Sequence, residues 1–207
     1  MKTHLNTLPA LLLVGLAGGA WVSNRPAPAP VVAPLAADTY EVDGSHSFVT
    51  FRVGHLGIGT ACGRFDKVAG TLQYDEANLA KSTLALEIDA ASIDTNNEKR
   101  DAHLKGADFF SVKEYPRITF TSTKVGRGSE KGEFEVKGKL SLHGVEKEVT
   151  AQCKLIGSGK DPWGGTRVGF EAKFTVERMD FGIDYMPDGL GKQVEVFIAI
   201  EGVKKEG

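Results

Sequence analysis

Residues 96–110, NNEKRDAHLKGADFF, contain side chains that could act in acid–base catalysis or bind an anion. They bring Arg100, Asp101 and His103 close together in the chain. An aspartate and a histidine can act as general acid and base. An arginine binds carboxylate or phosphate through its planar set of donors. The segment is therefore a candidate catalytic site or a candidate site for the polar head of a ligand.

The other histidines that follow the N-terminal segment predict no metal site. His46 stands before the first expected strand, where it organises a turn or faces the mouth of the fold. His55 alternates with Phe51, so it is either a satisfied core histidine or part of a cavity lining. His143, in LHGV, is typical of a turn. None of them stands in an HExxH motif or in a histidine–carboxylate cluster.

Arg178 falls on the apolar face of an expected strand, because it continues the alternation that contains Phe174. A buried arginine needs an anionic or hydrogen-bonding partner. An external partner would be the phosphate or carboxylate of a ligand. The internal candidates are Asp101, Asp180 and Asp184.

The sequence contains no pattern of a catalytic nucleophile. It has no GxSxG motif, no cysteine beside a base and no glycine-rich phosphate loop. Cys62 and Cys153 are far apart in the chain. Either they form a disulfide in an oxidising compartment, or they are two separate small residues of the core. We therefore predict no catalytic residue and no metal.

The segments that must position these side chains read as strands. From Tyr40 onward apolar and polar residues alternate, as in EFEVKGKLSLHG and RVGFEAKFTVERMDF, which predicts strands with one buried face. About eight such strands, mostly antiparallel, suit a closed barrel or a two-sheet sandwich. Some inward positions hold small residues, which either leave room for a ligand or fit the curvature of the strands. They are Gly70, Gly138, Ala151 and Ala172.

A single short helix interrupts the strands. Asn96 or Asn97 is its predicted N-cap and Gly106 ends its helical propensity. A helix of about 10 residues is marginal alone and has to dock on another element. Its stripe would turn Arg100 and His103 toward the barrel, fastened by the pair Phe109 and Phe110. The helix is a plug or lid, a polar cap on a cavity, or both.

The N-terminal residues are predicted not to belong to the folded domain. Residues 1–22 contain an uncharged apolar run that is short for a membrane-spanning helix and resembles a secretory signal or a short anchor. Residues 23–37 are a Pro/Ala-rich spacer, and 38–207 form the domain. We expect a periplasmic protein, tethered to the membrane if the segment is not cleaved.

The charge argues against a nucleic-acid partner. The whole chain carries a formal net charge of −2, and residues 1–37 contribute two basic residues and no acidic one. The predicted domain is therefore mildly acidic. Nucleic-acid binding relies on clustered lysine and arginine.

Four segments resemble the YceI-like family, in that family's order. The resemblance runs from about residue 39 to residue 205, and it implies an exported lipocalin-like antiparallel β-barrel with a helix over it. Such a barrel would hold an isoprenoid or another long-chain amphiphile. The segments are 43–55, 92–122, 138–149 and 176–183.

The resemblance implies an exported binding or carrier protein, not an enzyme, with a long-chain isoprenoid-type lipid held non-covalently and no other cofactor. Peripheral membrane association and a monomer or homodimer remain open. The alternative is a periplasmic stress-related enzyme or metal-dependent protein that uses Asp101 and nearby histidines; a filled barrel with a protein partner is a third. The predicted ligand-binding residues are His46, Phe51, His55, Leu72, Leu86, Arg100, His103, Phe109, Phe110, Phe120, Leu140, Phe170, Phe174 and Arg178.

Overall fold

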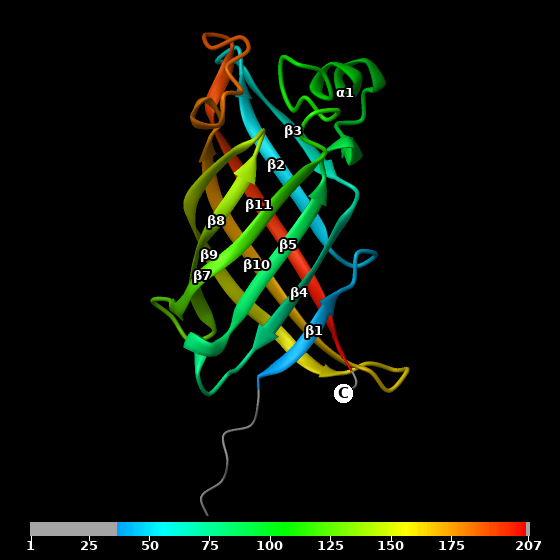
Figure 1. Cartoon of the computed structure of the whole chain (residues 1–207), viewed down its shortest axis with the longest axis vertical. Helices are drawn as coiled ribbons and strands as arrows, with labels where there is room; N and C mark the ends of the chain where they lie inside the picture. The colour runs from blue at the N-terminus through cyan, green and yellow to red at the C-terminus, as the bar shows by residue number, and fades with distance from the viewer. Residues whose placement is uncertain (1–36, 206–207) are drawn as a thin grey trace, which may run out of the picture. The chain divides into compact units, whose positions relative to one another are not determined.

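The computed structural model describes residues 37–205 (Figure 1). The predicted signal or anchor and all but the last residue of the spacer lie outside this range. No helix in the described range is long and apolar enough to cross a membrane. The strands are β1 (Asp38–Val42), β2 (Phe48–His55), β3 (Gly59–Phe65), β4 (Val68–Tyr74), β5 (Thr83–Asp89), β6 (Ile93–Asp94), β7 (Arg117–Arg127), β8 (Glu133–Leu142), β9 (Val145–Lys160), β10 (Thr166–Glu177) and β11 (Leu190–Lys204). The helices are α1 (Glu98–Leu104) and the 3-10 turns η1 (Leu79–Lys81), η2 (Ala90–Ser92) and η3 (Arg178–Phe181).

The sheet closes on itself. Its order is β1-β4-β5-β7-β8-β9-β10-β11, and β11 returns to pair with β1, so these eight strands form a ring. Neighbouring strands are antiparallel throughout, and β2, β3 and β6 extend the same sheet beyond β11. The predicted eight-stranded antiparallel barrel is thereby confirmed, and the sandwich is excluded.

Along three neighbouring strand paths of the sheet, a short irregular segment separates two strands. Both β1 and β2 pair with β11, so residues 43–47 interrupt a single path along that strand. In the same way β3 and β4, which pair with β2 and β1, are separated by residues 66–67. β5 and β6, which pair with β4 and β3, are separated by residues 90–92. Beyond the breaks β3 and β6 no longer reach β7, and α1 lies near that end of the barrel (Figure 1).

The alternation in the sequence becomes an inside and an outside. On β8 the even-numbered positions are buried, and they include Phe134, Val136 and Leu140. The core continues onto the facing strands, where Val168 and Ile198 are buried as well. One apolar face per strand therefore lines the interior of the barrel, as the period of two predicted.

The helix is anchored from both of its ends. Asn97 caps α1 by accepting a hydrogen bond at its side chain from the Arg100 amide, at 3.0 Å. Beyond its C-terminus Phe109 is buried, and Phe110 packs edge-on against Phe65 with ring centroids 5.6 Å apart. The helix has seven residues, fewer than expected, because the chain leaves helical geometry at Gly106 to place these two rings.

Candidate functional site

The barrel contains an apolar cavity of about 160 Å³, here called cavity 1. It runs from Leu104 and the rings that follow α1 to the middle of the strands. No polar atom of the described residues is exposed to it. The predicted binding residues that line cavity 1 are Phe51, Leu86, Phe109, Phe110, Phe120, Leu140, Phe174 and Arg178.

A second cavity of about 80 Å³, cavity 2, lies deeper along the barrel. Two further predicted residues, Leu72 and Phe170, line it. The rings of Tyr74 and Phe170 meet edge-on at 5.2 Å, and Phe134 packs against both. Leu79 of η1 is buried beside these rings. Aromatic side chains therefore make up much of the wall of cavity 2.

The two cavities meet at a ring of shared side chains, which we call the waist. The waist residues are Leu84, Val136, Cys153, Ala172 and Ile198, from β5, β8, β9, β10 and β11 respectively. Three of them are direct register partners, since Ala172 pairs with Cys153 on one side and with Ile198 on the other. These three residues therefore form one row across neighbouring strands, whereas Val136 pairs with Ala151.

Small inward residues have two different fates. At Gly138 a Cβ atom would collide with the Phe120 ring, so this glycine is filled by its neighbour rather than left as space. At Gly70 a Cβ atom would collide with the backbone carbonyl oxygen of Ala85, and Leu86 lies next to it. Ala151 and Ala172, in contrast, line cavity 1 directly. The glycines serve packing and curvature, while the alanines provide room.

Arg178 is buried at the edge of cavity 1, as its place in the alternation predicted. Of the two predicted kinds of partner, anionic or hydrogen-bonding, the second is found, and none of the three candidate carboxylates binds the guanidinium. Its guanidinium donates to backbone carbonyl oxygens of the segment that leads into β11, the closest being Ile183 at 2.7 Å, with Gly191 at 2.9 Å and Leu190 at 3.0 Å. Burial lowers the pKa of Arg178, and the nearby carboxylate of Glu177 opposes that shift.

The carbonyl cage determines what Arg178 offers to a ligand. Since its nitrogen atoms are bound to carbonyls and none is exposed to cavity 1, it presents only its carbon stem there. Its charge still acts on the cavity as a field. Two of the three internal carboxylates proposed from the sequence are engaged elsewhere: Asp101 accepts from Thr95, and Asp180 pairs with Lys147 at 3.2 Å. The third, Asp184, acts on Arg178 through its charge.

Two polar residues of α1 lie outside both cavities, although the helix stripe was expected to point them inward. Arg100 is exposed and donates to Thr95, from Nε to Oγ1 at 2.8 Å and from Nη2 to the carbonyl at 2.7 Å. His103 is exposed, with Nε2 2.8 Å from Asp108 Oδ2. Of this stripe only Leu104 lines cavity 1. The expected inward direction is therefore wrong for Arg100 and His103, because Thr95 and Asp108 hold them at the surface.

The remaining two predicted residues also lie away from the cavities. His55 is exposed at the last position of β2, so its expected inward direction is wrong. The strand ends there in a turn that starts with Leu56 at a positive φ of 54°. His46 lies in the break between β1 and β2, the turn position that was one of its two predicted roles.

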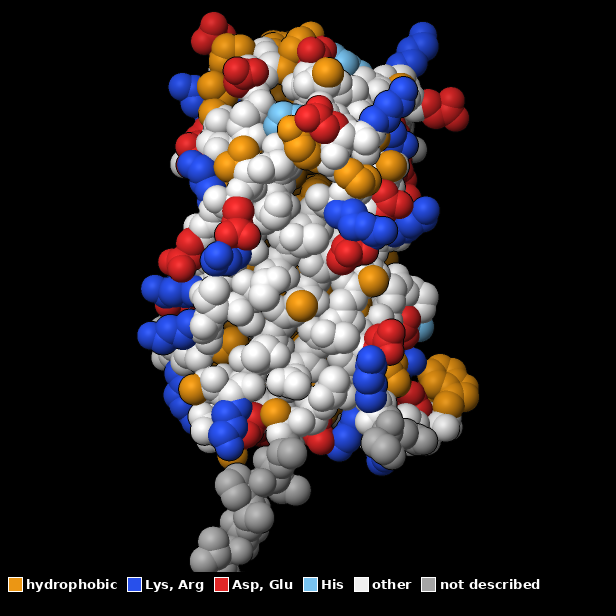
Figure 2. Space-filling model, viewed as in Figure 1, with side chains coloured by type: hydrophobic (Ala, Val, Ile, Leu, Met, Phe, Trp, Pro, Cys, Tyr) orange, Lys and Arg blue, Asp and Glu red, His pale blue; other side chains and the backbone are white. Residues whose placement is uncertain are grey.

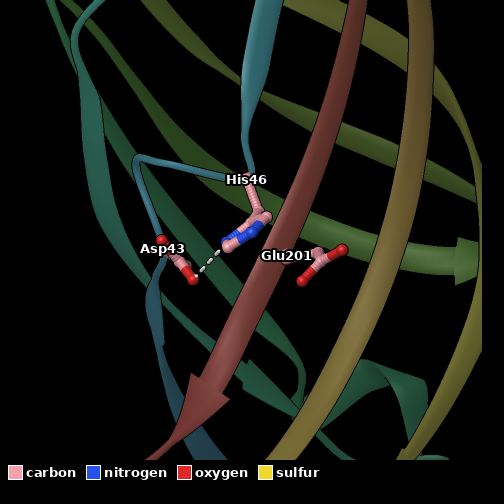
Figure 3. Close-up of side chains that lie close together, drawn as sticks. All are labelled: Asp43, His46 and Glu201. Atoms are coloured by element: carbon pink, nitrogen blue, oxygen red, sulfur yellow. Dashed lines mark hydrogen bonds and ion pairs between the residues drawn. The ribbon is translucent and has the colours of Figure 1, made fainter. Parts of the chain in front are cut away.

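His46 belongs to a polar cluster that could suggest a metal site (Figure 3). Potential ligand atoms of Asp43, His46 and Glu201 lie within 4.8 Å of one another. Arg167 is already bound there, with Nη1 2.7 Å from Asp43 Oδ2 and 3.2 Å from Glu201 Oε2. Hydrogen bonds from Ser45, Arg167 and His46 hold the pKa of Asp43 well below its usual range. A guanidinium in contact with both carboxylates opposes a second cation, so the cluster is best described as an ion-pair network.

Asp101 and the histidines do not form a joint acid–base site in the described part of the chain. Asp101 Oδ1 accepts from the Thr95 amide at 2.9 Å and from its hydroxyl at 2.5 Å. His103 contacts Asp108 instead, and its ring packs edge-on against the rings of Tyr185 and Phe109. The arrangement expected for the enzymatic alternative is therefore not assembled.

The two cysteines are free and have different surroundings. Cys62 is exposed on β3, while Cys153 is at the waist. Burial raises the pKa of the Cys153 thiol to about 12. The disulfide is absent from the described structure, and the alternative of two separate residues holds, with only Cys153 in the core.

The sequence reasoning missed most of the cavity wall. Most of the lining residues that were not predicted occupy inward positions of strands, like the predicted ones. The alternation of the sequence therefore indicated them, but the prediction kept only a few side chains per strand. Alternation could not predict that Ile183 and Leu190 line the cavity, because an irregular loop connects these two residues. Other missed residues of cavity 1 are Val49, Val53, Phe65, Ile88, Leu104, Ile118, Ala151, Val176, Val194 and Val196.

The outer face at the α1 end carries apolar side chains interspersed with charged ones (Figure 2). Leu56, Ile58, Tyr185 and Met186 are among the exposed large hydrophobic residues, and Ile58 is 85% exposed. Leu56 and Gly189 join their two loops through a 2.7 Å backbone hydrogen bond. This end of the barrel is therefore amphipathic, in contrast to the purely apolar cavity surface below it.

Comparison with known proteins identifies the fold and the family. The family model for the YceI-like domain matches residues 40–202. Protein YceI of Escherichia coli O157:H7 is 42% identical over 174 residues, covering 83% of this chain and 90% of that protein. A UPF0312 protein of Vibrio cholerae is 40% identical over 177 residues, covering 85% and 92% respectively.

Solved structures share the barrel. The YceI protein of Campylobacter jejuni has a TM-score of 0.63 at 28% identity, covering 73% of this chain and 90% of that one. BcnA of Burkholderia cenocepacia has a TM-score of 0.70 at 22% identity, covering 77% and 98%. A polyisoprenoid binding domain from Saccharophagus degradans has a TM-score of 0.61 at 18% identity, covering 80% and 98%. With the family model and the relatives above, these matches confirm the resemblance: the chain belongs to the YceI-like family.

Proposed function

We propose that the protein is an exported carrier that holds the apolar chain of an isoprenoid-type lipid, or of a similar amphiphile, inside its barrel. The observation that carries this proposal is cavity 1, which is lined by barrel strands and the segment after α1, and to which no polar atom of the described residues is exposed. A hydrocarbon chain has no hydrogen bonds to water to replace when it enters such a cavity. Each methylene group it buries contributes roughly 0.8 kcal/mol to the free energy of binding.

The same apolar surface argues against a polar head inside the cavity. A head group without a hydrogen-bonding partner in such a place costs roughly 2–7 kcal/mol. We therefore place the head at the α1 end, where Asp108, His103 and Tyr185 are exposed beside the ring of Phe109. The tail would run past Phe109 and Phe110 into the barrel.

The volumes limit the shape of the occupant. Typical ligand pockets have about 300–1,000 Å³, whereas cavities 1 and 2 have about 160 and 80 Å³. A single slender chain fits this space better than a fused-ring compound does. The polyisoprenoid-binding neighbour supports the isoprenoid class.

The proposal is tested first by native mass spectrometry of protein exported from a bacterial host, followed by extraction and identification of any lipid. One long-chain amphiphile per protein is the expected result. A ligand-free mass that stays unchanged after incubation with isoprenoid diphosphates, quinones and fatty-acid derivatives would contradict the carrier function.

A variant pair tests the location. Leu140 lines cavity 1, while the next residue on β8, Ser141, lies on the opposite face of the strand. Leu140→Arg should abolish lipid retention, and Ser141→Arg should retain it, because only the first places a charge against the chain. Circular dichroism establishes that both variants fold. Normal retention by folded Leu140→Arg would refute the cavity as the binding site.

A further inference from the structure

We propose that the waist selects the length of the bound chain. A short chain would bind wholly in cavity 1, on the α1 side of the waist. A longer chain would have to cross the waist to place its tip in cavity 2. This inference rests on the proposed function and adds a property that the fold alone does not provide.

The side chains that form the waist set the space available to a chain that crosses it. Leu84, Val136 and Ile198 are large, whereas Ala172 and Cys153 are small and lie side by side as register partners. A chain that crosses the waist would therefore pass over Ala172 and Cys153. Neither residue brings a charge into the passage, because burial keeps the Cys153 thiol protonated.

Cavity 2 has the properties of a terminal compartment. It is the smaller of the two, at about 80 Å³, and its wall contains the edge-on rings of Tyr74, Phe134 and Phe170. Leu79 of η1 packs buried against it. A close-packed cluster of side chains deforms little. This compartment would therefore set an upper limit on the length of the chain that fits without rearrangement.

The test measures affinities of the purified, delipidated domain for geraniol, farnesol, geranylgeraniol and solanesol. These isoprenoid alcohols share one head and differ in length. Ala172 lines both cavities, so Ala172→Leu should weaken geraniol binding modestly, as a leucine added elsewhere in the wall of cavity 1 would. The effect of a blocked waist comes in addition and appears only with chains that cross it. Chains that cross the waist should lose about tenfold for every two methylene groups kept out of cavity 2.

A matched control makes the same change elsewhere in the barrel. Ala151 also lines cavity 1 but not cavity 2, and it is buried. Ala151→Leu should weaken short and long alcohols alike. Ile198→Ala widens the waist and should favour the longest alcohols relative to geraniol. If Ala172→Leu does not fold, Cys153→Leu makes the equivalent change at its register partner.

The outcomes separate this inference from the proposed function. If the wild-type domain binds none of the alcohols, the proposed function fails and the inference fails with it. If the wild type binds them but Ala172→Leu and Ala151→Leu show the same dependence on length, the waist does not select and the carrier function stands. A loss that grows with chain length in Ala172→Leu but not in Ala151→Leu would support selection at the waist.

Discussion

At the scale of single residues, Arg178 shows how a charge can be kept inside a barrel without a carboxylate. The protein surrounds the guanidinium with carbonyl oxygens from the segment that follows η3. Those carbonyls in turn gain a charged donor, and hydrogen bonds to charged groups contribute about 1.5–3 kcal/mol each. Arg178 therefore fastens the loop that closes the barrel end.

Replacing Arg178 should loosen that loop. Arg178→Met keeps much of the stem but leaves the carbonyl oxygens of Ile183, Leu190 and Gly191 without their donor. We expect a loss of about 3 kcal/mol or more, which lowers Tm by about 6–12 °C for a domain of this size. Hydrogen exchange should be faster around residues 183–191. Arg52→Met, at an exposed arginine, is the control and should change Tm by less than about 2 °C.

The ion-pair network around Asp43 should make stability depend on acid. Its folded-state pKa is depressed, so the ionised form is preferred on folding and contributes stability above the unfolded pKa of about 3.9. That contribution is lost as the pH falls from there through the folded-state value. We expect Asp43→Asn to lower Tm at neutral pH, and the difference from wild type to shrink below about pH 4. A constant difference down to pH 2 would contradict this assignment.

The two thiols should differ in reactivity. Cys62 is exposed, whereas Cys153 is buried with its pKa raised to about 12, and the thiolate is the reactive form. A thiol reagent at pH 8 should therefore modify one thiol per native molecule, and the second only after unfolding in guanidinium. Cys62→Ser should show no fast reaction. Rapid modification of both thiols in the native protein would mean that the waist is open to solvent.

At the scale of elements, the sequence predicted the strands and the helix better than it predicted the directions of polar side chains. Alternation identified the inward faces of β8 and β10, and Asn97 was one of two expected caps. The direction of Arg100 could not be predicted, because Thr95 became its partner only through the local fold of the segment before α1. Hydrogen bonds and ion pairs between nearby residues, rather than hydrophobic periodicity, set the directions of these polar side chains.

Those interactions give α1 a specific weak point. Asp101 connects the helix to Thr95 through two hydrogen bonds, whereas Asp108 only pairs with the exposed His103. Asp101→Ala should therefore speed hydrogen exchange across residues 98–104, with a local loss of about 1–3 kcal/mol. Asp108→Ala is the matched control and should have little effect. Equal exchange in the two variants would show that Thr95 does not anchor the helix.

At the scale of the whole molecule, closure was beyond what the sequence could decide. Alternating strands suit a barrel and a sandwich equally, and the difference lies in the pairing of β1 with β11 at opposite ends of the domain. The waist likewise depends on the register of β9, β10 and β11, and one bulge near Phe170 shifts that register. Long-range register, rather than local pattern, determines where the cavities lie.

An unfilled interior has a consequence for the stability of the entire barrel. Cavities cost packing energy, so a ligand that binds only the folded state should stabilise it. At a free concentration of 100 times Kd the gain is about 2.7 kcal/mol, or a rise in Tm of about 5–11 °C. Delipidated protein should show this rise with geranylgeraniol. Prenol, which carries the same head on a single isoprene unit, should give almost none at the same concentration. An equal rise with both alcohols would mean that the head, rather than chain burial in the barrel, supplies the stabilisation.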